Sequence, residues 1–355
     1  MIWIFYVPFL ITSVLILMSG RRNGFVVAQL FVVTSIFALL AGTRYGDNDY
    51  SNYADIFKAI PYLDGFDLAS VEEIHGEIGY LFTASIAKTF GFNHQGFLFL
   101  IAATTVAFIA LATWRLSYFP LASMLFYYSH VFLLREMMQI RAALAIAIML
   151  LAFSLHGNFK RIAGILGASL FHSGALIVLP FYLLVQKLDF NWKSYLPVFL
   201  FALSVSTVGV AQPLTALLAE IGLLPAAVAT YVGWDIYNAR LNVLTNPVTW
   251  KAFFILYCLR KVTNEELGSA IGLLRNLYAS GLLVFLCFAD FAILAGRLST
   301  FLFLGEAILL SWALFYQRNR NIGILICILA SLAQLSLNLL LNNVHQQYDL
   351  YFLAI

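Results

Sequence analysis

Charged side chains are scarce in this 355-residue chain, where Asp, Glu, Lys and Arg together make up 10% of the residues. Soluble globular domains carry roughly 25%, so a chain that is also 62% hydrophobic cannot cover a water-facing surface. The 20 basic and 17 acidic residues nearly balance and form no basic run, which argues against nucleic-acid binding. Together with a mean hydropathy of +0.90, this composition predicts an integral membrane protein.

The residues and motifs that usually build soluble active sites are also missing. Cys258, Cys287 and Cys327 all lie inside apolar runs, which indicates packing rather than disulfides or metal binding. His75, His94, His130, His156 and His345 show no metal-ligand spacing, so we expect no metal centre built from histidine and no cofactor. The acidic residues of the first loop leave binding of a divalent ion open as an alternative. Phosphate-loop, Gly-x-Ser-x-Gly and His-Glu-x-x-His patterns do not occur.

Long apolar runs fill most of the chain, and twelve of them approach the ~20 residues needed to cross a bilayer. We therefore predict an all-α, polytopic bundle of about 12 transmembrane segments that forms a single domain over residues 1–355. The first run lacks a basic flank and a small-residue cleavage site, which indicates a retained helix. The runs are 2–18, 24–42, 97–113, 118–134, 136–155, 162–185, 195–211, 213–229, 248–262, 269–289, 298–316 and 321–340. Gln212-Pro213 separates two of these runs, and a broken or re-entrant element is the alternative there.

Basic residues in short loops predict the orientation, because such loops stay in the cytoplasm. The basic loops contain Arg21-Arg22, Arg115, Lys160-Arg161, Arg260-Lys261, and Arg318 with Arg320. These basic loops all lie on one side only if the apolar stretch 77–91 does not cross the bilayer. With ~15 residues, this stretch is also shorter than the ~20 needed to cross. We therefore expect it to lie as an interfacial helix within a periplasmic segment 43–96. A second periplasmic loop is expected at 230–247.

Acidic and tyrosine side chains gather in the first periplasmic segment. Asp47, Asp49 and Glu77 are candidate catalytic acids, because a carboxylate can take a proton from a sugar hydroxyl. Tyr50 and Tyr53 are candidate sugar-binding rings. The alternatives are that the loop acids are merely solvated and that Glu77 only complements the dipole of the helix it begins.

Cations within or beside apolar runs are the second set of candidates, for binding a diphosphate. A guanidinium fork donates to two phosphate oxygens at once. The candidates are Arg135, Arg141, His172 and Arg297, with Arg141 one and a half turns deeper in the helix than Arg135. Structural alternatives are an Arg141–Glu136 pair, an Arg297–Asp290 pair and a packing role for His172. Trp234 and Arg240, in an aromatic loop, are further candidates for sugar binding.

The order of these motifs resembles the EpsG-type, or Wzy-like, family of bacterial polysaccharide polymerases. The matching motifs are Gly46-Asp47 with Tyr50 and Tyr53, Glu77-Ile78-Gly79-Tyr80, Ile140-Arg141-Ala142-Ala143-Leu144-Ala145, Lys160-Arg161 followed by Phe171-His172-Ser173-Gly174-Ala175, and Gly296-Arg297-Leu298-Ser299. A looser similarity links the early periplasmic segment, up to Phe90-Gly91, to membrane glycosyltransferases of the GT-C type. The alanine at 142 replaces a frequent family glutamine, so Arg135 and Arg141 both stay candidates for the principal phosphate ligand.

The resemblance implies a reaction. Such polymerases extend O-antigen (lipopolysaccharide), capsule or exopolysaccharide chains on undecaprenyl diphosphate, in the inner membrane with the active site facing the periplasm. It implies lipid-linked oligosaccharide as substrate, and a chain-length regulator and a flippase of the same pathway as partners. The alternatives are a transporter or flippase of lipid-linked oligosaccharide, an O-antigen ligase and a GT-C glycosyltransferase.

Overall fold

The computed structural model describes residues 2–20, 23–46, 49–188, 192–223, 231–232, 239–263, 268–316, 318–341 and 349–350. Within these ranges the chain is helical apart from one pair of two-residue strands, so the all-α prediction is confirmed. The chain divides into two compact units. The first unit combines residues 1–176 with 310–355, and the second is residues 177–309. The predicted single domain stays a prediction.

Four described helices are long and apolar enough to cross a membrane, which identifies the chain as a membrane protein. They are α2 (Gly24–Gly42), α6 (His94–Leu116), α17 (Ser269–Cys287) and α20 (Arg320–Ser336), the last continued by a π-helical turn at Leu337–Leu341. Two bent pairs raise the number to six if each pair is one span. The expected count of about 12 is therefore not confirmed among the described residues.

Breaks inside the apolar runs explain the lower number. The run 118–134 is divided into α7 (Pro120–Tyr127), a π-helical turn (Tyr128–Phe132) and α8 (Leu133–Arg135). The run 162–185 is divided by a turn between α10 (Asn158–Ser169) and a 3-10 turn (Ser173–Ile177) that leads into α11 (Val178–Val185). Two further apolar helices, α1 (Trp3–Met18) and α9 (Ile140–Phe153), have 16 and 14 residues. A hydropathy average over about 20 residues does not detect such breaks, because a helix can end or bend without a polar residue at that point.

The first unit is built on close contacts between α2, α6, α9 and α10. A Cβ atom on Gly42 would lie 2.9 Å from the Cα atom of Phe99, and one on Gly164 would lie 2.1 Å from the Cβ atom of Ala152. Glycine at these positions therefore lets α2 approach α6, and α10 approach α9. The C-terminal helix α20 belongs to the same unit, where Arg320 donates to the backbone carbonyl of Ser19.

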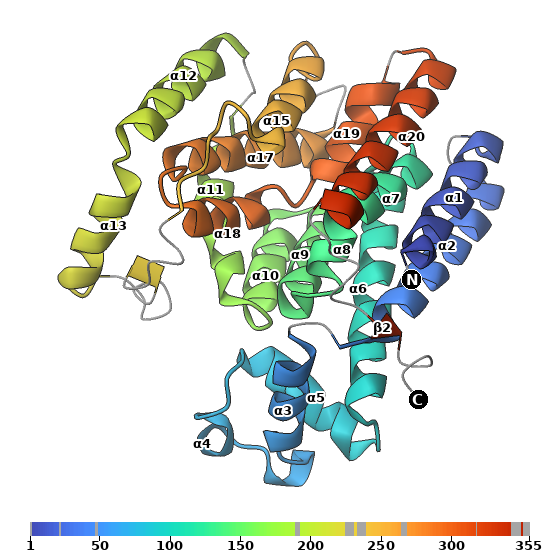
Figure 1. Ribbon diagram of the computed structural model, residues 1–355, viewed down its shortest axis with the longest axis vertical. Coiled ribbons are helices and arrows are strands. Elements are labelled where there is room, and N and C mark those ends of the chain that lie inside the picture. The colour runs from blue at the N-terminus through green and yellow to red at the C-terminus, as the bar shows by residue number, and fades with distance from the viewer. Residues whose placement is uncertain are drawn as a thin grey trace. The chain divides into compact units, whose positions relative to one another are not determined.

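Residues 43–96 form a compact group of short helices at one end of α6 (Figure 1). The elements are β1 (Arg44–Tyr45), α3 (Tyr50–Ala59), a 3-10 turn (Leu63–Gly65), α4 (Leu68–Val71) and α5 (Ile78–Thr89). The strand β1 pairs antiparallel with β2 (Asp349–Leu350). With 12 residues α5 is roughly 18 Å long, well short of a hydrocarbon core of about 30 Å. Its position at the membrane interface stays a prediction.

The second unit packs around α17, whose polar side chains donate hydrogen bonds to the backbone near the ends of neighbouring helices. Further described helices of this unit are α11, α12 (Trp192–Val208), α13 (Ala211–Glu220), α15 (Pro247–Cys258) and α18 (Ala292–Leu302). Buried Arg275 donates to the carbonyls of Leu259 and Val262, just beyond α15. Buried Asn276 donates to the carbonyls of Val185 and Leu188 at the end of α11. These side chains therefore tie α17 to the backbone at the ends of two neighbouring helices.

The break near Gln212 is a sharp bend of 71° between α12 and α13, as the alternative of a broken or re-entrant element predicts. Gly209 has a φ of +76°, which an L side chain rarely adopts. The carboxylate of Asp290 accepts from the backbone N–H of Gln212 at 2.9 Å and so caps α13. A similar bend of 66° joins α18 to α19 (Glu306–Phe315).

Thiol labelling tests the predicted topology. Leu68 at the start of α4 and Phe90 at the end of α5 are 75% and 78% exposed, and Phe159 is 83% exposed at the start of α10. In a chain without its native cysteines, we expect Leu68→Cys and Phe90→Cys to react with an impermeant reagent added outside the cell. Phe159→Cys should react only after permeabilisation. Labelling of Phe90→Cys from the inside alone would show that α5 crosses the bilayer.

Candidate active site

Glu77 is the residue at which the predicted catalytic acids and the predicted phosphate ligands meet. It lies at the N-cap position of α5, but its side chain does not cap that helix. Its Oε2 atom accepts from Nη1 of Arg141 at 2.7 Å. Its Oε1 atom accepts from the backbone N–H of Ser173 at 3.0 Å and from the Ser173 hydroxyl at 3.4 Å. One carboxylate therefore joins α5, α9 and the turn after α10.

Arg141 lies against a pair of aromatic rings whose centres are 5.9 Å apart. Its guanidinium carbon lies 5.8 Å from the ring centres of both Tyr53 and Tyr80, within the range of cation–π attraction. Its Nη2 atom is 3.4 Å from Nε2 of His75. The side chains of Arg141 and Glu77 are 16% and 20% exposed, so the pair is accessible from outside. We call this group the Arg141 cluster; its members are Tyr53, His75, Glu77, Tyr80, Arg141 and Ser173.

The chain reaches this geometry because α9 begins afresh at Ile140. Residues 136–139 form a turn after α8, with Gln139 at the N-cap position of α9. Arg141 therefore lies in the first turn of its own helix. The expectation that it sits one and a half turns deeper than Arg135 in one continuous helix is wrong. Placed at the helix start, the guanidinium reaches the helix group of residues 43–96.

Gly79 sets the distance between α5 and the turn that carries Ser173. Its backbone N–H donates to the carbonyl oxygen of Leu170 at 2.8 Å. A Cβ atom at this position would lie 2.7 Å from the same oxygen and 2.8 Å from the Leu170 Cβ atom. Only glycine allows this approach, which keeps Glu77 within reach of Ser173.

The two tyrosines contribute rings rather than charge. Burial raises the pKa of Tyr53, and the nearby Arg141 cation only partly offsets it. Burial also raises the pKa of Tyr80, with a further increase from Tyr53. Both phenols are therefore protonated at neutral pH and cannot act as bases. Tyr53 was expected to face a sugar, but its ring is only 6% exposed and faces the guanidinium instead.

The arrangement is suited to binding an anion at the end of a helix. Arg141 supplies a charged fork, and its Nε atom has no hydrogen-bond partner within the described part of the chain. The Glu77 carboxylate fixes one edge of the fork, and the rings restrict its rotation. Preorganised donors of this kind stabilise negative charge without reorganising at the moment of reaction. Among the described residues no three His, Cys, Asp or Glu side chains are grouped to hold a metal.

Other predicted site residues in the first unit lie outside the cluster. Arg135 contacts the side chain of Gln139. His172 accepts from the backbone N–H of Gly174 through Nδ1 at 3.1 Å. Tyr50 donates to Gln95 at 3.0 Å and packs edge-on against His94. Asp49 occupies the N-cap position of α3, close enough to Tyr53 to contribute to the rise of its pKa.

The remaining candidates belong to the second unit or lie outside the described residues. Arg297 contacts the hydroxyl of Tyr231, and its guanidinium carbon is 4.6 Å from the centre of that ring. Arg240 donates to the carbonyls of Ser206 and Thr207 at 2.6 and 2.7 Å, at the end of α12. Asp47 and Trp234 lie outside the described residues, as do Arg21-Arg22.

Two structural alternatives from the sequence are replaced by other contacts. Glu136 does not pair with Arg141: it is buried and accepts from the hydroxyl of Tyr127, while its carbonyl accepts from Arg44 at 3.3 Å. Asp290 caps α13 instead of pairing with Arg297. Glu136 thus accepts from a tyrosine hydroxyl, and Asp290 accepts from a backbone N–H, in place of the arginine that the sequence suggested for each.

The sequence interpretation assigned no role to His75 or Ser173, although both touch the site. His75 lacks metal-ligand spacing, and nothing else in its surroundings marks it. Ser173 lies inside the Phe171-His172-Ser173-Gly174 motif, in which only His172 was predicted to bind the diphosphate. The usable signal was the pair of glycines, Gly76 and Gly79, that flank Glu77 and indicate a close approach.

Comparisons with known proteins agree with this motif set. The Amylovoran biosynthesis protein AmsC of Erwinia amylovora is 25% identical over 318 residues, which cover 83% of this chain and 81% of the relative. No solved structure matches the chain significantly. The family model of the EpsG family matches residues 27–352, which include every member of the Arg141 cluster. The resemblance found in the motifs is thus confirmed, and the chain belongs to the EpsG family.

Proposed function

We propose that this protein is a membrane glycosyltransferase that polymerises oligosaccharide repeat units linked to undecaprenyl diphosphate. The observation that carries the proposal is the Arg141–Glu77 pair, a partly exposed guanidinium fixed at the start of an apolar helix. Membership of the EpsG family supports polysaccharide polymerisation, and a relative named for amylovoran biosynthesis supports the same process.

In the proposed reaction, the anomeric carbon of the growing glycan exchanges one oxygen for another. Its bond to the diphosphate oxygen breaks, and a bond to a hydroxyl oxygen of the terminal sugar on a new lipid-linked unit forms. The hydroxyl proton passes to a carboxylate, and undecaprenyl diphosphate leaves. Arg141 stabilises the charge that develops on the leaving diphosphate.

The contacts of Glu77 distinguish its role from the roles of the other two predicted acids, Asp47 and Asp49. Both of its oxygens already accept hydrogen bonds, from Arg141 and from Ser173. We therefore assign Glu77 to positioning the guanidinium. The acceptor proton then goes to Asp47 or Asp49, which precede α3 in the same segment.

The proposed site faces the periplasm across the bacterial inner membrane. The support is the distribution of charge along α6 and α9. The Arg141 cluster lies at the start of α9. Two cations lie at the opposite end of the bundle of α6 and α9: Arg115 in the last turn of α6, and Lys160 in the first turn of α10, which follows the end of α9. Basic residues are retained on the cytoplasmic side.

A transporter of lipid-linked oligosaccharide is the second candidate. The observation that favours it is the presence of two bent helix pairs, α12 with α13 and α18 with α19. Paired broken helices are a common feature of transporter binding sites. The polymerase proposal is preferred because the Arg141 cluster offers reaction chemistry and the family supports it.

Deleting the gene separates the two candidates. A polymerase mutant should display single repeat units at the surface and lose the ladder of longer chains on a gel, because export does not require polymerisation. Complementation with the wild-type chain should restore the ladder. Loss of all surface glycan, including the single unit, would contradict the polymerase proposal and favour the transporter.

A further inference from the structure

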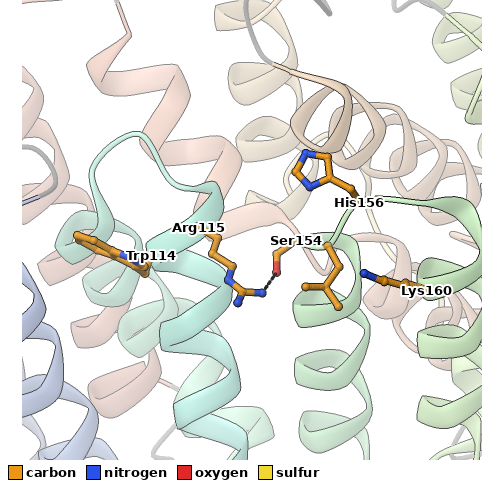
Figure 2. A pocket seen from close by; sticks show the side chains of 6 residues that line it. Trp114, Arg115, Ser154, His156 and Lys160 are labelled. Carbon is orange, nitrogen blue, oxygen red and sulfur yellow. Dashed lines mark hydrogen bonds between the residues drawn. The ribbon is translucent and has the colours of Figure 1, made fainter.

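A pocket of roughly 510 Å³ lies in the first unit where α6 and α9 end and α10 begins (Figure 2). This size is within the ~300–1,000 Å³ typical of small-molecule sites. Figure 2 shows Arg115 and Lys160 extending toward each other from opposite sides, with Ser154 between them. Arg115 donates to the Ser154 hydroxyl at 3.4 Å. The lining residues are Trp114, Arg115, Ser154, Leu155, His156 and Lys160.

The charge around this pocket has one sign. The segments 112–120, 153–162 and 314–322, which lie at this end of the first unit, contain no Asp or Glu. Lys160 is in the first turn of α10, where the helix dipole disfavours a cation. The adjacent Arg161 is only 8% exposed, and its Nε atom has no partner within the described ranges. Such an excess of positive charge calls for an anion.

Apolar and aromatic side chains surround the same region. Phe159 is 83% exposed next to Lys160. Trp312 packs on Tyr118 and Tyr316, with ring centres 5.1 and 5.5 Å away, and its indole donates to the carbonyl of Leu116 at 2.8 Å. Aromatic rings with a polar group are typical of the level of lipid head groups. The anion is therefore expected where the membrane meets water.

We propose that this pocket binds the phosphate of an anionic phospholipid head group. Arg115 and Lys160 would contact the phosphate oxygens from two sides, and Trp114, Leu155 and Phe159 would pack along the glycerol and upper acyl chain. The Ser154 hydroxyl donates to the carbonyl of Leu151 at 2.6 Å and accepts from Arg115, so its role is to orient the guanidinium. A soluble phosphate offers the same charge, but it would leave this apolar rim unused. The proposal does not depend on the reaction assigned to the Arg141 cluster, which lies at the opposite ends of α6 and α9.

The test uses the purified full-length protein in a neutral detergent and measures thermal unfolding during lipid titration. Phosphatidylglycerol should raise the melting temperature in a saturable manner, and phosphatidylcholine should not. In the double variant Arg115→Gln/Lys160→Gln the apparent affinity for phosphatidylglycerol should fall about tenfold or more, since each cation near the surface contributes appreciably to anionic-lipid binding. Both side chains are exposed, so the variant should elute from a sizing column as the wild type does.

Arg318→Gln is the matched control, because it removes one exposed cation beside α20 without touching the pocket. It should keep an affinity within about twofold of wild type, since general attraction falls off over the Debye length. An equal loss in this control, or an unchanged double variant, would overturn the pocket assignment. Inorganic phosphate at millimolar concentration is the last arm: stabilisation by phosphate alone, with displacement of the lipid effect, would assign the pocket to a soluble phosphate and overturn the lipid proposal.

Discussion

Replacing Arg141 by alanine is expected to abolish glycan polymerisation while the protein still accumulates in the membrane. Loss of one preorganised donor to a developing anion lowers rates by roughly 10²–10³. The stability cost should stay small, on the order of 1 kcal/mol, because the pair with Glu77 is partly exposed. The ladder of surface glycan and the amount of protein in membranes are the two measurements.

Further variants separate a role in the reaction from a role in folding. Arg141→Lys keeps the charge but loses the fork, so polymerisation should be strongly reduced and still detectable. Lys58→Ala is the matched control, because it breaks an exposed ion pair with Asp55 in the same segment and should leave the ladder unchanged. If Arg141 only neutralised Glu77, Arg141→Ala would accumulate poorly, and adding Glu77→Gln would restore both protein and ladder. A wild-type ladder from Arg141→Ala would remove this residue from the mechanism.

Gly79→Ala is the second substitution with a large expected effect. The added methyl group would meet backbone atoms of Leu170 at 2.7 and 3.0 Å, so α5 must move away from the turn that carries Ser173. Overpacking of this kind costs roughly 1–3 kcal/mol. The movement should also separate Glu77 from Ser173. We expect a lower melting temperature of the purified protein and loss of the ladder.

Gly167→Ala provides the comparison, because this helical glycine has no atom within 4 Å of the added Cβ position. Alanine is favoured over glycine inside a helix by up to about 1 kcal/mol, so this variant should be as stable as wild type or more so. The two substitutions are chemically identical and should act in opposite directions. A rise in melting temperature for both would show that α5 does not depend on its contact with Leu170.

The sequence predicted the membrane character and the residues of the site better than the helices that carry them. Composition alone distinguishes a lipid environment from water, and the motif around Glu77 and the motif around Arg141 both mark real members of the cluster. The π-helical turn at Tyr128–Phe132 was missed because it lies among apolar residues. The runs were divided at Arg135, but the second was expected to start at residue 136, whereas α9 begins only at Ile140. The predicted depth of Arg141 was wrong for that reason.

Pairing was the other property that the sequence could not provide. Glu77 and Arg141 are 64 positions apart, and the nearer Glu136 was the natural partner to consider for Arg141. The structure instead directs Glu136 to Tyr127, since a buried carboxylate takes the closest donor. Likewise, buried Arg275 and Asn276, to which the sequence assigned no role, donate to the carbonyls of Leu259 and Leu188 beyond α15 and α11. Such contacts depend on which helix ends meet, and local patterns carry no information about that.

The division of the first unit between the two ends of the chain has a consequence for biogenesis. Residues 177–309 must be synthesised before residues 310–355 can complete it, which takes on the order of ten seconds at roughly 5–20 residues per second. During that interval the Ser129 carbonyl lacks its donor from Asn338, and the N–H of Phe119 lacks the Ser311 hydroxyl. Until residues 310–355 follow, the N-terminal part of the first unit is therefore incomplete in both packing and hydrogen bonding.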